Sequence, residues 1–234
     1  MVFDENMSEV SVDMPGTYDV LLNRAFHADE MWNTFCVPFD IDAEQAALYF
    51  NDVRKLESAE YRDGACILSF SGKQDRMEAG VPYLVKANEA YESLVFNDVN
   101  VKTVTEDERA VAVKNDEVDV TMTGNYGMID KLEDRYFIKD NLFYLADSES
   151  NVNVKGFRAT IKLNDSPNPE ANTLFIKVDG EVTAVDQVLM DEFLDGKLYD
   201  IKGQIVDPAY SENKNLNKLP KGIYIIHGKK IINK

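Results

Sequence analysis

The chain of 234 residues carries 42 acidic and 25 basic side chains, which gives a formal net charge of −17 at pH 7. Its hydrophobic content of 44% is enough to close a folded core, so a wholly disordered chain is excluded. A surface this acidic repels phosphate backbones and anionic membranes, because binding either of them relies on Lys and Arg. No apolar run is long enough to span a bilayer as a helix. We therefore expect no nucleic-acid partner and no transmembrane segment.

Short alternating or apolar runs, broken by Gly, Asn and Asp, predict strands and turns along most of the chain. Residues 118–122 alternate most cleanly, as a strand buried on one face does. Lys139, Asp140 and Asn141 predict a tight hairpin connection. Up to residue 163, strands are expected at 20–26, 32–37, 66–70, 83–87, 94–104, 111–113, 118–122, 136–138, 142–144 and 157–163. The pattern indicates an all-β fold, either a β-sandwich or a partly closed barrel.

One segment departs from this pattern and predicts a short helix. Residues 42–50 begin with Asp42 as an N-cap, have Glu44 and Gln45 in the first turn, and are rich in Ala. We therefore expect one short helix within the first β-rich domain.

Two prolines one residue apart, Pro167 and Pro169, predict a domain boundary. Neither can donate to a strand ladder, and each favours an extended chain before it. We expect a β-rich domain over residues 1–166, a linker over 167–173, and a small antiparallel β-sandwich over 174–234. In the last part, the runs that predict strands are 173–178, 197–201, 204–206 and 223–226.

Soft metal ligands are few in this sequence: Cys36, Cys66, His27 and His227. A closed zinc site needs about four such ligands, usually in close pairs, and these residues lack that spacing. The acidic clusters do not repeat the spacing of a calcium-binding loop either. We expect no metal and no cofactor. Both cysteines lie in apolar, strand-like runs, so one disulfide and two buried thiols are both open interpretations.

Five strings of residues go beyond general β-strand chemistry. In chain order they are WNTFCVPFD (32–40), AGVPYLVK (79–86), TGNY (123–126), DNLFY (140–144) and KGFRA (155–159). Taken together, they resemble a β-rich domain that recurs in secreted and surface proteins of Bacteroides and Prevotella. The resemblance covers residues 18–163 and implies a Bacteroidetes origin and a location outside the cell. It does not imply a specific activity, because the molecular role of that family is mostly unassigned.

The C-terminal segment carries a second resemblance. Its strings are LYDIKGQIV (198–206) and LPKGIYIIHGKKI (219–231). They resemble the C-terminal sorting domain of type IX secretion, over about residues 174–234, with Gln204 where that family usually has a basic residue. The resemblance implies export to the cell exterior or the outer-membrane surface. Residues 1–14 are acidic and polar rather than basic and then apolar, so they do not form a secretory signal, and we expect this sequence to be a mature part.

The terminal hairpin predicts a recognition element within that segment. Residues 223–226 are strongly β-prone, and Pro220 cannot donate to a ladder, so the hairpin begins after it. Its two consecutive lysines place positive charge on an acidic molecule, where a sorting receptor could bind. The alternative is an ordinary closing hairpin of a small sandwich. The candidate export or anchoring residues are Gly222, Tyr224, Gly228, Lys229 and Lys230.

Four side chains are candidates for ligand contact, and each has a structural alternative. Trp32 is the only tryptophan; it either stacks on a sugar ring or anchors the core beside Phe35 and Phe39. Tyrosines are also favoured in strands by packing alone. The turn at 124–127 is the aromatic turn that we expect to be most exposed. The candidate ligand-binding residues are Trp32, Asn125, Tyr126 and Tyr144.

The sequence offers no set of residues typical of catalysis. The motifs G-x-S-x-G, H-E-x-x-H and G-x-x-x-x-G-K-[ST] are all missing. We expect a non-catalytic secreted or cell-surface module that acts in adhesion, glycan contact or scaffolding, with a glycan or a host or bacterial surface protein as partner. Two alternatives stay open. One is a glycan-processing enzyme or its accessory carbohydrate-binding domain, which needs two convergent carboxylates. The other is a purely structural spacer.

Overall fold

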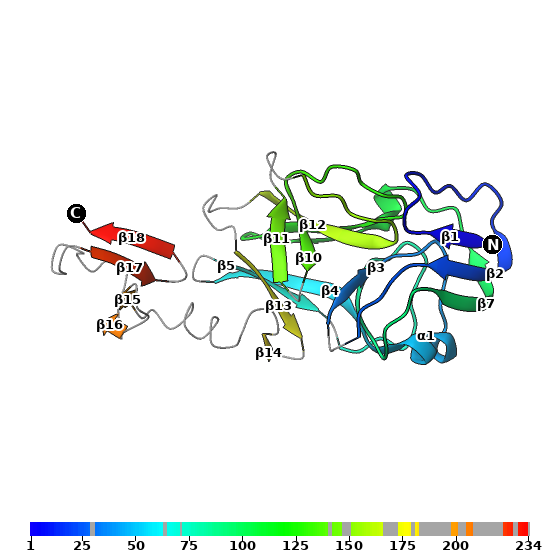
Figure 1. Cartoon of the computed structure of the whole chain (residues 1–234), viewed down its shortest axis with the longest axis horizontal. Coiled ribbons are helices and arrows are strands. Elements are labelled where there is room, and N and C mark those ends of the chain that lie inside the picture. The colour runs from blue at the N-terminus through cyan, green and yellow to red at the C-terminus, as the bar shows by residue number, and fades with distance from the viewer. Residues whose placement is uncertain are drawn as a thin grey trace. The chain divides into compact units, whose positions relative to one another are not determined.

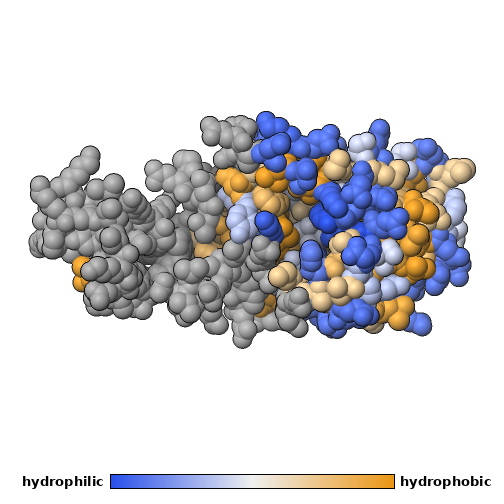
Figure 2. Space-filling model, viewed as in Figure 1, coloured by the Kyte–Doolittle hydropathy of each residue, from blue (hydrophilic) through white to orange (hydrophobic). Residues whose placement is uncertain are grey.

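Strands dominate the computed structural model, which describes residues 1–28, 31–62, 65–70, 72–139, 142–146, 151–165, 173–178, 181–182, 198–200, 205–207, 222–226 and 229–233 (Figure 1). The chain divides into two units, Met1–Glu181 and Val182–Lys234. In the described part of the chain there is a single α-helix, so the predicted all-β class is confirmed. On the face shown in Figure 2, hydrophilic residues cover much of the described surface, with hydrophobic residues among them.

The N-terminus belongs to a three-stranded sheet with the order β1-β2-β7. It contains β1 (Val2–Asp4), β2 (Gly16–Asn23) and β7 (Leu94–Val101), which lie side by side in Figure 1. β1 pairs in parallel with β2, and β2 is antiparallel to β7. The sequence pattern did not predict β1, because a strand of three residues is too short to show a period.

A five-stranded antiparallel sheet has the order β11-β10-β12-β9-β8. The short 3-10 helix η1 (Asp107–Arg109) directly precedes β8, the strand of this sheet that comes first in the chain. Lys139 is the partner of Leu142 in the β10–β11 pair, so the hairpin predicted around residue 140 is confirmed. The strands are β8 (Ala110–Lys114), β9 (Asp119–Asn125), β10 (Arg135–Lys139), β11 (Leu142–Ala146) and β12 (Arg158–Asp165).

A six-stranded sheet has the order β14-β13-β5-β4-β6-β3. Its longest strand, β4 (Phe50–Arg62), pairs with β6 through its first part and with β5 through its second part. The helix α1 (Ala43–Tyr49) leads directly into that strand. The strands are β3 (Asn33–Phe35), β4 (Phe50–Arg62), β5 (Ala65–Phe70), β6 (Tyr83–Ala87), β13 (Thr173–Val178) and β14 (Glu181–Val182).

The predicted helix is confirmed together with its cap. The backbone N–H of Gln45 donates to Asp42 Oδ1 at 2.9 Å, which satisfies one of the free donors at the helix N-terminus. The helix is short, and Ala46 is the residue that it buries. Phe50 is already extended, so the chain passes from helix to strand without a loop.

A cluster of aromatic side chains forms the centre of the first unit. The rings of Phe26, Phe35 and Phe50 contact one another with centroids between 5.4 and 5.6 Å apart. Phe39 contacts Phe3 at 6.2 Å, in a stacked arrangement. These residues come from different parts of the first 50 positions, and tilted or offset aromatic pairs add to the stability gained from burial alone. The cluster therefore joins β1, the segment before β3, and β4 in one core.

The position of β13 differs from the expected domain boundary. It pairs in parallel with β5 over its whole length, from Thr173 opposite Ala65 to Val178 opposite Phe70. The side chains of Leu174, Phe175 and Ile176 are buried. The structure therefore includes β13 in the first unit and divides the chain after Glu181, because these apolar side chains are covered in that sheet.

The second unit contains one four-stranded antiparallel sheet with the order β16-β15-β17-β18. Its outer hairpin, β17 and β18, pairs Gly222 with Asn233 and Ile226 with Lys229. The predicted terminal hairpin is therefore present. The strands are β15 (Leu198–Asp200), β16 (Ile205–Asp207), β17 (Gly222–Ile226) and β18 (Lys229–Asn233).

Candidate ligand-binding site

The expected exposed turn around Tyr126 is in fact buried, so that expectation was wrong. Tyr126 is 3% exposed, its hydroxyl donates to the Val37 carbonyl at 3.2 Å, and its ring is stacked on Phe157. Burial raises the pKa of this hydroxyl. Arg109 covers the ring, with its Cζ 4.5 Å from the centroid. The side chain packs in the core, although Tyr126 is among the residues that line a second pocket of about 580 Å³.

Asn125 is also buried and holds the chain around the turn. Its amide nitrogen donates to the carbonyls of Gly127 and Lys155 at 2.9 and 2.8 Å. β9 ends at Asn125, so these bonds fasten the end of the strand to the segment that precedes β12. Asn125 therefore has a structural task in addition to any contact with a ligand.

Trp32 and Tyr144 lie close to a common pocket. Trp32 is 6% exposed and lines that pocket, with Lys86 Nζ 4.9 Å from its ring centroid. Tyr144 on β11 is 41% exposed and stacks on Phe137 of β10, with centroids 5.8 Å apart. Phe137 itself lines the pocket. Of the four candidate ligand residues, Trp32 therefore lines this pocket, and Tyr144 is connected to it through its contact with Phe137.

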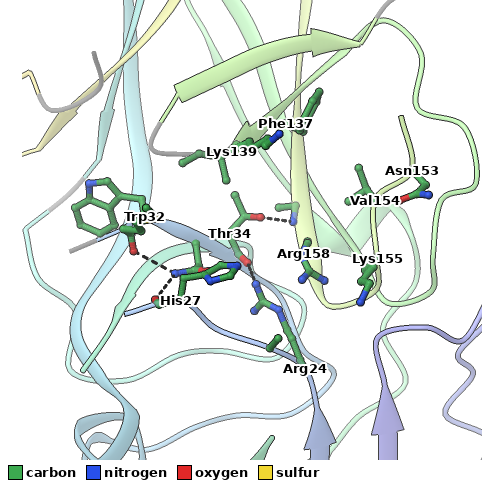
Figure 3. A pocket seen from close by; sticks show the side chains of 15 residues that line it. Arg24, His27, Trp32, Thr34, Phe137, Lys139, Asn153, Val154, Lys155 and Arg158 are labelled. Atoms are coloured by element: carbon green, nitrogen blue, oxygen red, sulfur yellow. Dashed lines mark hydrogen bonds between the residues drawn. The ribbon is translucent and has the colours of Figure 1, made fainter. Parts of the chain in front are cut away.

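This pocket, which we call the basic pocket, has a volume of about 380 Å³ (Figure 3). One wall comes from the segment between β2 and β3, including His27 and Trp32. The opposite wall comes from β10, the segment before β12, and the start of β12. Its described lining residues are 24, 25, 27, 31–34, 137–139, 153–155, 158 and 159.

The basic pocket contains four cationic side chains and, among its described lining residues, no Asp or Glu. Lys139 and Lys155 are exposed, Arg158 is half-buried and Arg24 is buried. The whole chain has an excess of 17 negative charges, so this concentration of positive charge is opposite to the average. A concave site lined by one sign of charge attracts ligands of the other sign.

A strained turn places Lys155 and Arg158 side by side. Phe157 has a φ of 57°, in the left-handed region that a bulky side chain rarely adopts. The residue before it must be glycine, because a Cβ at Gly156 would lie 2.2 Å from the Tyr126 carbonyl oxygen. The Gly156 N–H donates to the Glu5 carbonyl at 2.7 Å, and this bond helps to hold the turn. The turn therefore directs both cations toward the same region.

Glu5, which is not among the lining residues, partly balances these two cations. Lys155 Nζ donates to its Oε1 at 2.8 Å, and Arg158 Nη1 lies 2.7 Å from its Oε2. Burial of the carboxyl raises its pKa, but the two cations outweigh this effect, and the pKa of Glu5 is lowered from its ordinary value. One carboxylate thus serves two positive side chains, so Glu5 and the described lining residues together carry a net positive charge.

Arg24 lies at the bottom of the basic pocket and is 1% exposed. Its Nη2 donates to the Thr34 carbonyl at 2.6 Å, and its guanidinium carbon is 4.0 Å from the ring centroid of Phe26. The Thr34 hydroxyl in turn accepts from the backbone N–H of Ala159 at 3.0 Å. Burial, and then the charge of Arg158, lower the pKa of the Arg24 guanidinium. The charge of Glu5 opposes this shift, so Arg24 already has one carboxylate in its surroundings.

Sequence reasoning did not identify the cations of this pocket. Lys155 and Arg158 lie in the string KGFRA, which served only to support a family resemblance. Arg24 lies directly after β2, in a run that reads as an ordinary strand. A basic residue within an apolar run of a strongly acidic chain is the signal that could have pointed to it.

The two cysteines are both buried and unpaired, which decides between the two open interpretations. The Cys36 Sγ donates to the Gly80 carbonyl at 3.2 Å, and Cys66 lies in β5. Burial raises the pKa of each thiol to about 12. Among the described residues, no group of His, Cys, Asp and Glu side chains is arranged to hold a metal ion.

Comparison with known families bears on the C-terminal segment. Residues 166–233 match the family described as "Secretion system C-terminal sorting domain". Because of this similarity, we call residues 166–233 the sorting tail. This finding supports an extracellular or cell-surface location, and it confirms the resemblance read from residues 198–206 and 219–231. The chain matches no curated protein and no solved structure at a significant level. The resemblance of the N-terminal strings to a Bacteroides and Prevotella domain stays a prediction.

The candidate recognition residues of the sorting tail fall mostly on its outer hairpin. Gly222 and Tyr224 lie in β17, and Lys229 and Lys230 lie in β18. Gly228 lies outside the described residues. Tyr224 pairs with Ile231 on one side and with Asp200 on the other, so β17 is an inner strand of the sheet. Of the described residues, none belongs to a helix that is long and apolar enough to cross a membrane.

Proposed function

We propose that this chain is an exported, non-catalytic binding module that contacts a glycan at the basic pocket. The sorting tail supports the export. The observation that carries the binding role is the pair Phe137 and Tyr144, in which an exposed tyrosine stacks on a ring that lines a polar pocket. Ligand pockets combine such apolar faces with a few polar groups that fix orientation.

The lining of the pocket also supports a non-catalytic role. Hydrolysis of a glycosidic bond by the usual route needs two carboxyl groups on either side of the bond. The described lining residues of the basic pocket include cations and amides but no such pair. Binding without turnover is the activity that this set of side chains fits best.

A glycan array tests this proposal with two variants on one strand. Tyr144 and Leu145 are similarly exposed, at 41% and 39%, but they point to opposite faces of β11. We expect Tyr144→Ala to weaken glycan binding by roughly tenfold, as loss of an aromatic contact does, and Leu145→Ala to bind as the unchanged protein does. Equal loss in both variants, or no glycan binding by the unchanged protein, would argue for a structural spacer instead.

A further inference from the structure

We propose that the glycan bound in the basic pocket is acidic, and that its carboxylate or sulfate group is held by Arg24, Lys155 and Arg158. This inference rests on the proposed function and adds the chemical class of the ligand. Three observations carry it: an incompletely bonded buried guanidinium, an uneven distribution of charge, and an aromatic pair beside the cations.

The first observation is the state of Arg24. Its Nε and Nη1 donate to no described residue, although both atoms are buried. Leaving the donors of a buried charged group unsatisfied is costly, because the group has lost its water without gaining a partner. The contact with Phe26 at 4.0 Å offsets only part of this cost. An anion close to the guanidinium would offset more of it.

A purely structural role for Arg24 explains less. Holding the Thr34 carbonyl uses only Nη2, and a neutral donor would do this without burying a charge. It also leaves unexplained why Lys139, Lys155 and Arg158 line the same pocket. Figure 3 shows Arg24, Lys155 and Arg158 on one side of the pocket, below Phe137 and Lys139.

The second observation is the balance of charge around the pocket. Of the carboxylates that the structure describes, Glu5 is the one that pairs with Lys155 and Arg158, at 2.8 and 2.7 Å. It can neutralise only one of these two charges, and Arg24 and Lys139 add further positive charge at the lining. In a chain with 42 acidic residues, such a site is suited to a ligand that brings its own negative charge.

The third observation favours an acidic sugar over an acidic peptide. Phe137 and Tyr144 lie on neighbouring strands and present aromatic surface next to the cations. A ring-shaped ligand with one charged substituent can contact both features at once. A side-chain carboxylate of a peptide needs only the cations. The basic pocket therefore matches a uronic acid or a sulfated sugar in a glycan chain.

The full chain provides its own probe for the test, because Trp32 is the only tryptophan and lines the pocket. Tryptophan fluorescence would be followed during titration with oligogalacturonate, with a chondroitin sulfate oligosaccharide, with a neutral galacto-oligosaccharide and with a polyglutamate peptide. We expect one of the two acidic glycans to bind at least about tenfold more tightly than the neutral one, and its affinity to fall as salt is added. The first two probes separate a carboxylate ligand from a sulfate ligand.

Three variants locate the anion. Lys139→Gln removes an exposed charge and should weaken binding of the acidic glycan by up to about fivefold. Lys155→Gln should have an effect in the same direction. Arg24→Gln should lower the affinity for the acidic glycan by roughly 30-fold or more, because it removes a buried donor that would bind the charged group of the ligand. Arg76→Gln is the matched control: Arg76 is exposed, pairs with Asp75 and does not line the basic pocket. Circular dichroism would establish that each variant is folded, and Lys139→Gln and Lys155→Gln keep the test valid if Arg24→Gln does not fold.

The failures of the two proposals are distinguishable. If the neutral glycan binds as tightly as the acidic ones, the inference is overturned and glycan binding stands. If polyglutamate binds and no glycan does, both the acidic glycan and the glycan-binding role are overturned. If the variants bind the acidic glycan as tightly as Arg76→Gln does, the anion lies elsewhere and the inference fails. If no probe binds, both proposals fall.

Discussion

Glu5 and Arg158 are joined by a partly buried ion pair, with Oε2 and Nη1 2.7 Å apart. Glu5 directly follows β1, and Arg158 is the first residue of β12, so the pair links the first strand of the chain to the inner strand of another sheet. Since Lys155 shares the same carboxylate, the charge of Glu5 affects both the stability of the unit and the charge of the basic pocket.

This pair predicts a loss of stability in acid. The pKa of Glu5 is lowered in the folded protein from its ordinary value of 4.5. A carboxyl group with a lowered pKa contributes stability above its ordinary value, and this contribution is lost as the pH falls through the folded pKa. Near neutral pH we expect Glu5→Gln to reduce the free energy of unfolding by about 1–3 kcal/mol, and the difference from the unchanged protein to shrink below pH 4.5. Urea unfolding over a pH series measures this.

Glu92→Gln is the control for that series, because Glu92 is exposed. The free energy of unfolding of Glu92→Gln should stay close to that of the unchanged protein at every pH. A Glu5→Gln difference that does not change between neutral and acidic pH would show that the carboxylate is not stabilised by its two cations.

The cysteines predict a simple pattern of thiol reactivity. Burial raises the pKa of Cys36 and of Cys66 to about 12, and the thiolate is the reactive form. We expect a thiol reagent to label neither cysteine in the native protein and both after denaturation. Labelling of a native cysteine would contradict the burial, and no labelling after denaturation would reveal a disulfide.

The close packing at Gly124 predicts that adding a single methyl group there is not tolerated. A Cβ added to Gly124 would lie 2.2 Å from Cys36 Sγ and 2.6 Å from Cys36 Cβ, so β9 and the segment that follows β3 would have to move apart. We expect Gly124→Ala to lower the free energy of unfolding by about 1–3 kcal/mol. Gly72→Ala is the control, since a Cβ there meets nothing within 4 Å. Similar midpoints of chemical denaturation for the two variants would contradict the close contact.

The pairing of β13 with β5 predicts that the start of the sorting tail stabilises the first unit. Ile176 is fully buried in this sheet, whereas Lys177 points away and lies 3.9 Å from Glu60. We expect Ile176→Ala to destabilise the unit by about 2–4 kcal/mol, and Lys177→Ala by less than about 1 kcal/mol. Hydrogen exchange of the β5 amides measures the effect locally. Unchanged protection of β5 in Ile176→Ala would show that β13 is not part of this core.

The all-β class and the one helix could be predicted from the sequence because each depends on local pattern. The Asp42 cap and the Ala-rich run need no tertiary information, and both are confirmed. β4 could not be predicted in this way. Register shifts after Phe50 and after Leu56 interrupt its alternation, and the apolar side chains that it buries are three residues apart rather than two. These residues are Phe50, Val53, Leu56 and Ala59.

The candidate site was predictable only in part, because side chains that are distant in the chain form it. Trp32 and Tyr144 were selected as aromatic residues, and the structure brings them near one pocket. Tyr126 was expected to be exposed because Gly124 and Gly127 flank it. Those glycines instead allow close packing, since a Cβ at Gly127 would lie 2.4 Å from the Ser8 carbonyl oxygen. Glycines beside an aromatic residue indicate a tight fit as readily as an open turn.

The parallel pairing of β13 also limits where the tail can be separated from the rest of the protein. A cut before Thr173 would uncover the whole edge of β5, with the main-chain N–H and C=O groups of Ala65–Phe70 free on that side. Uncovered edges of this kind join strands of other molecules, so the shortened protein would be prone to aggregate. A cut beyond Val178 would keep that edge covered. A cut that leaves the first unit intact must therefore lie on the C-terminal side of β13.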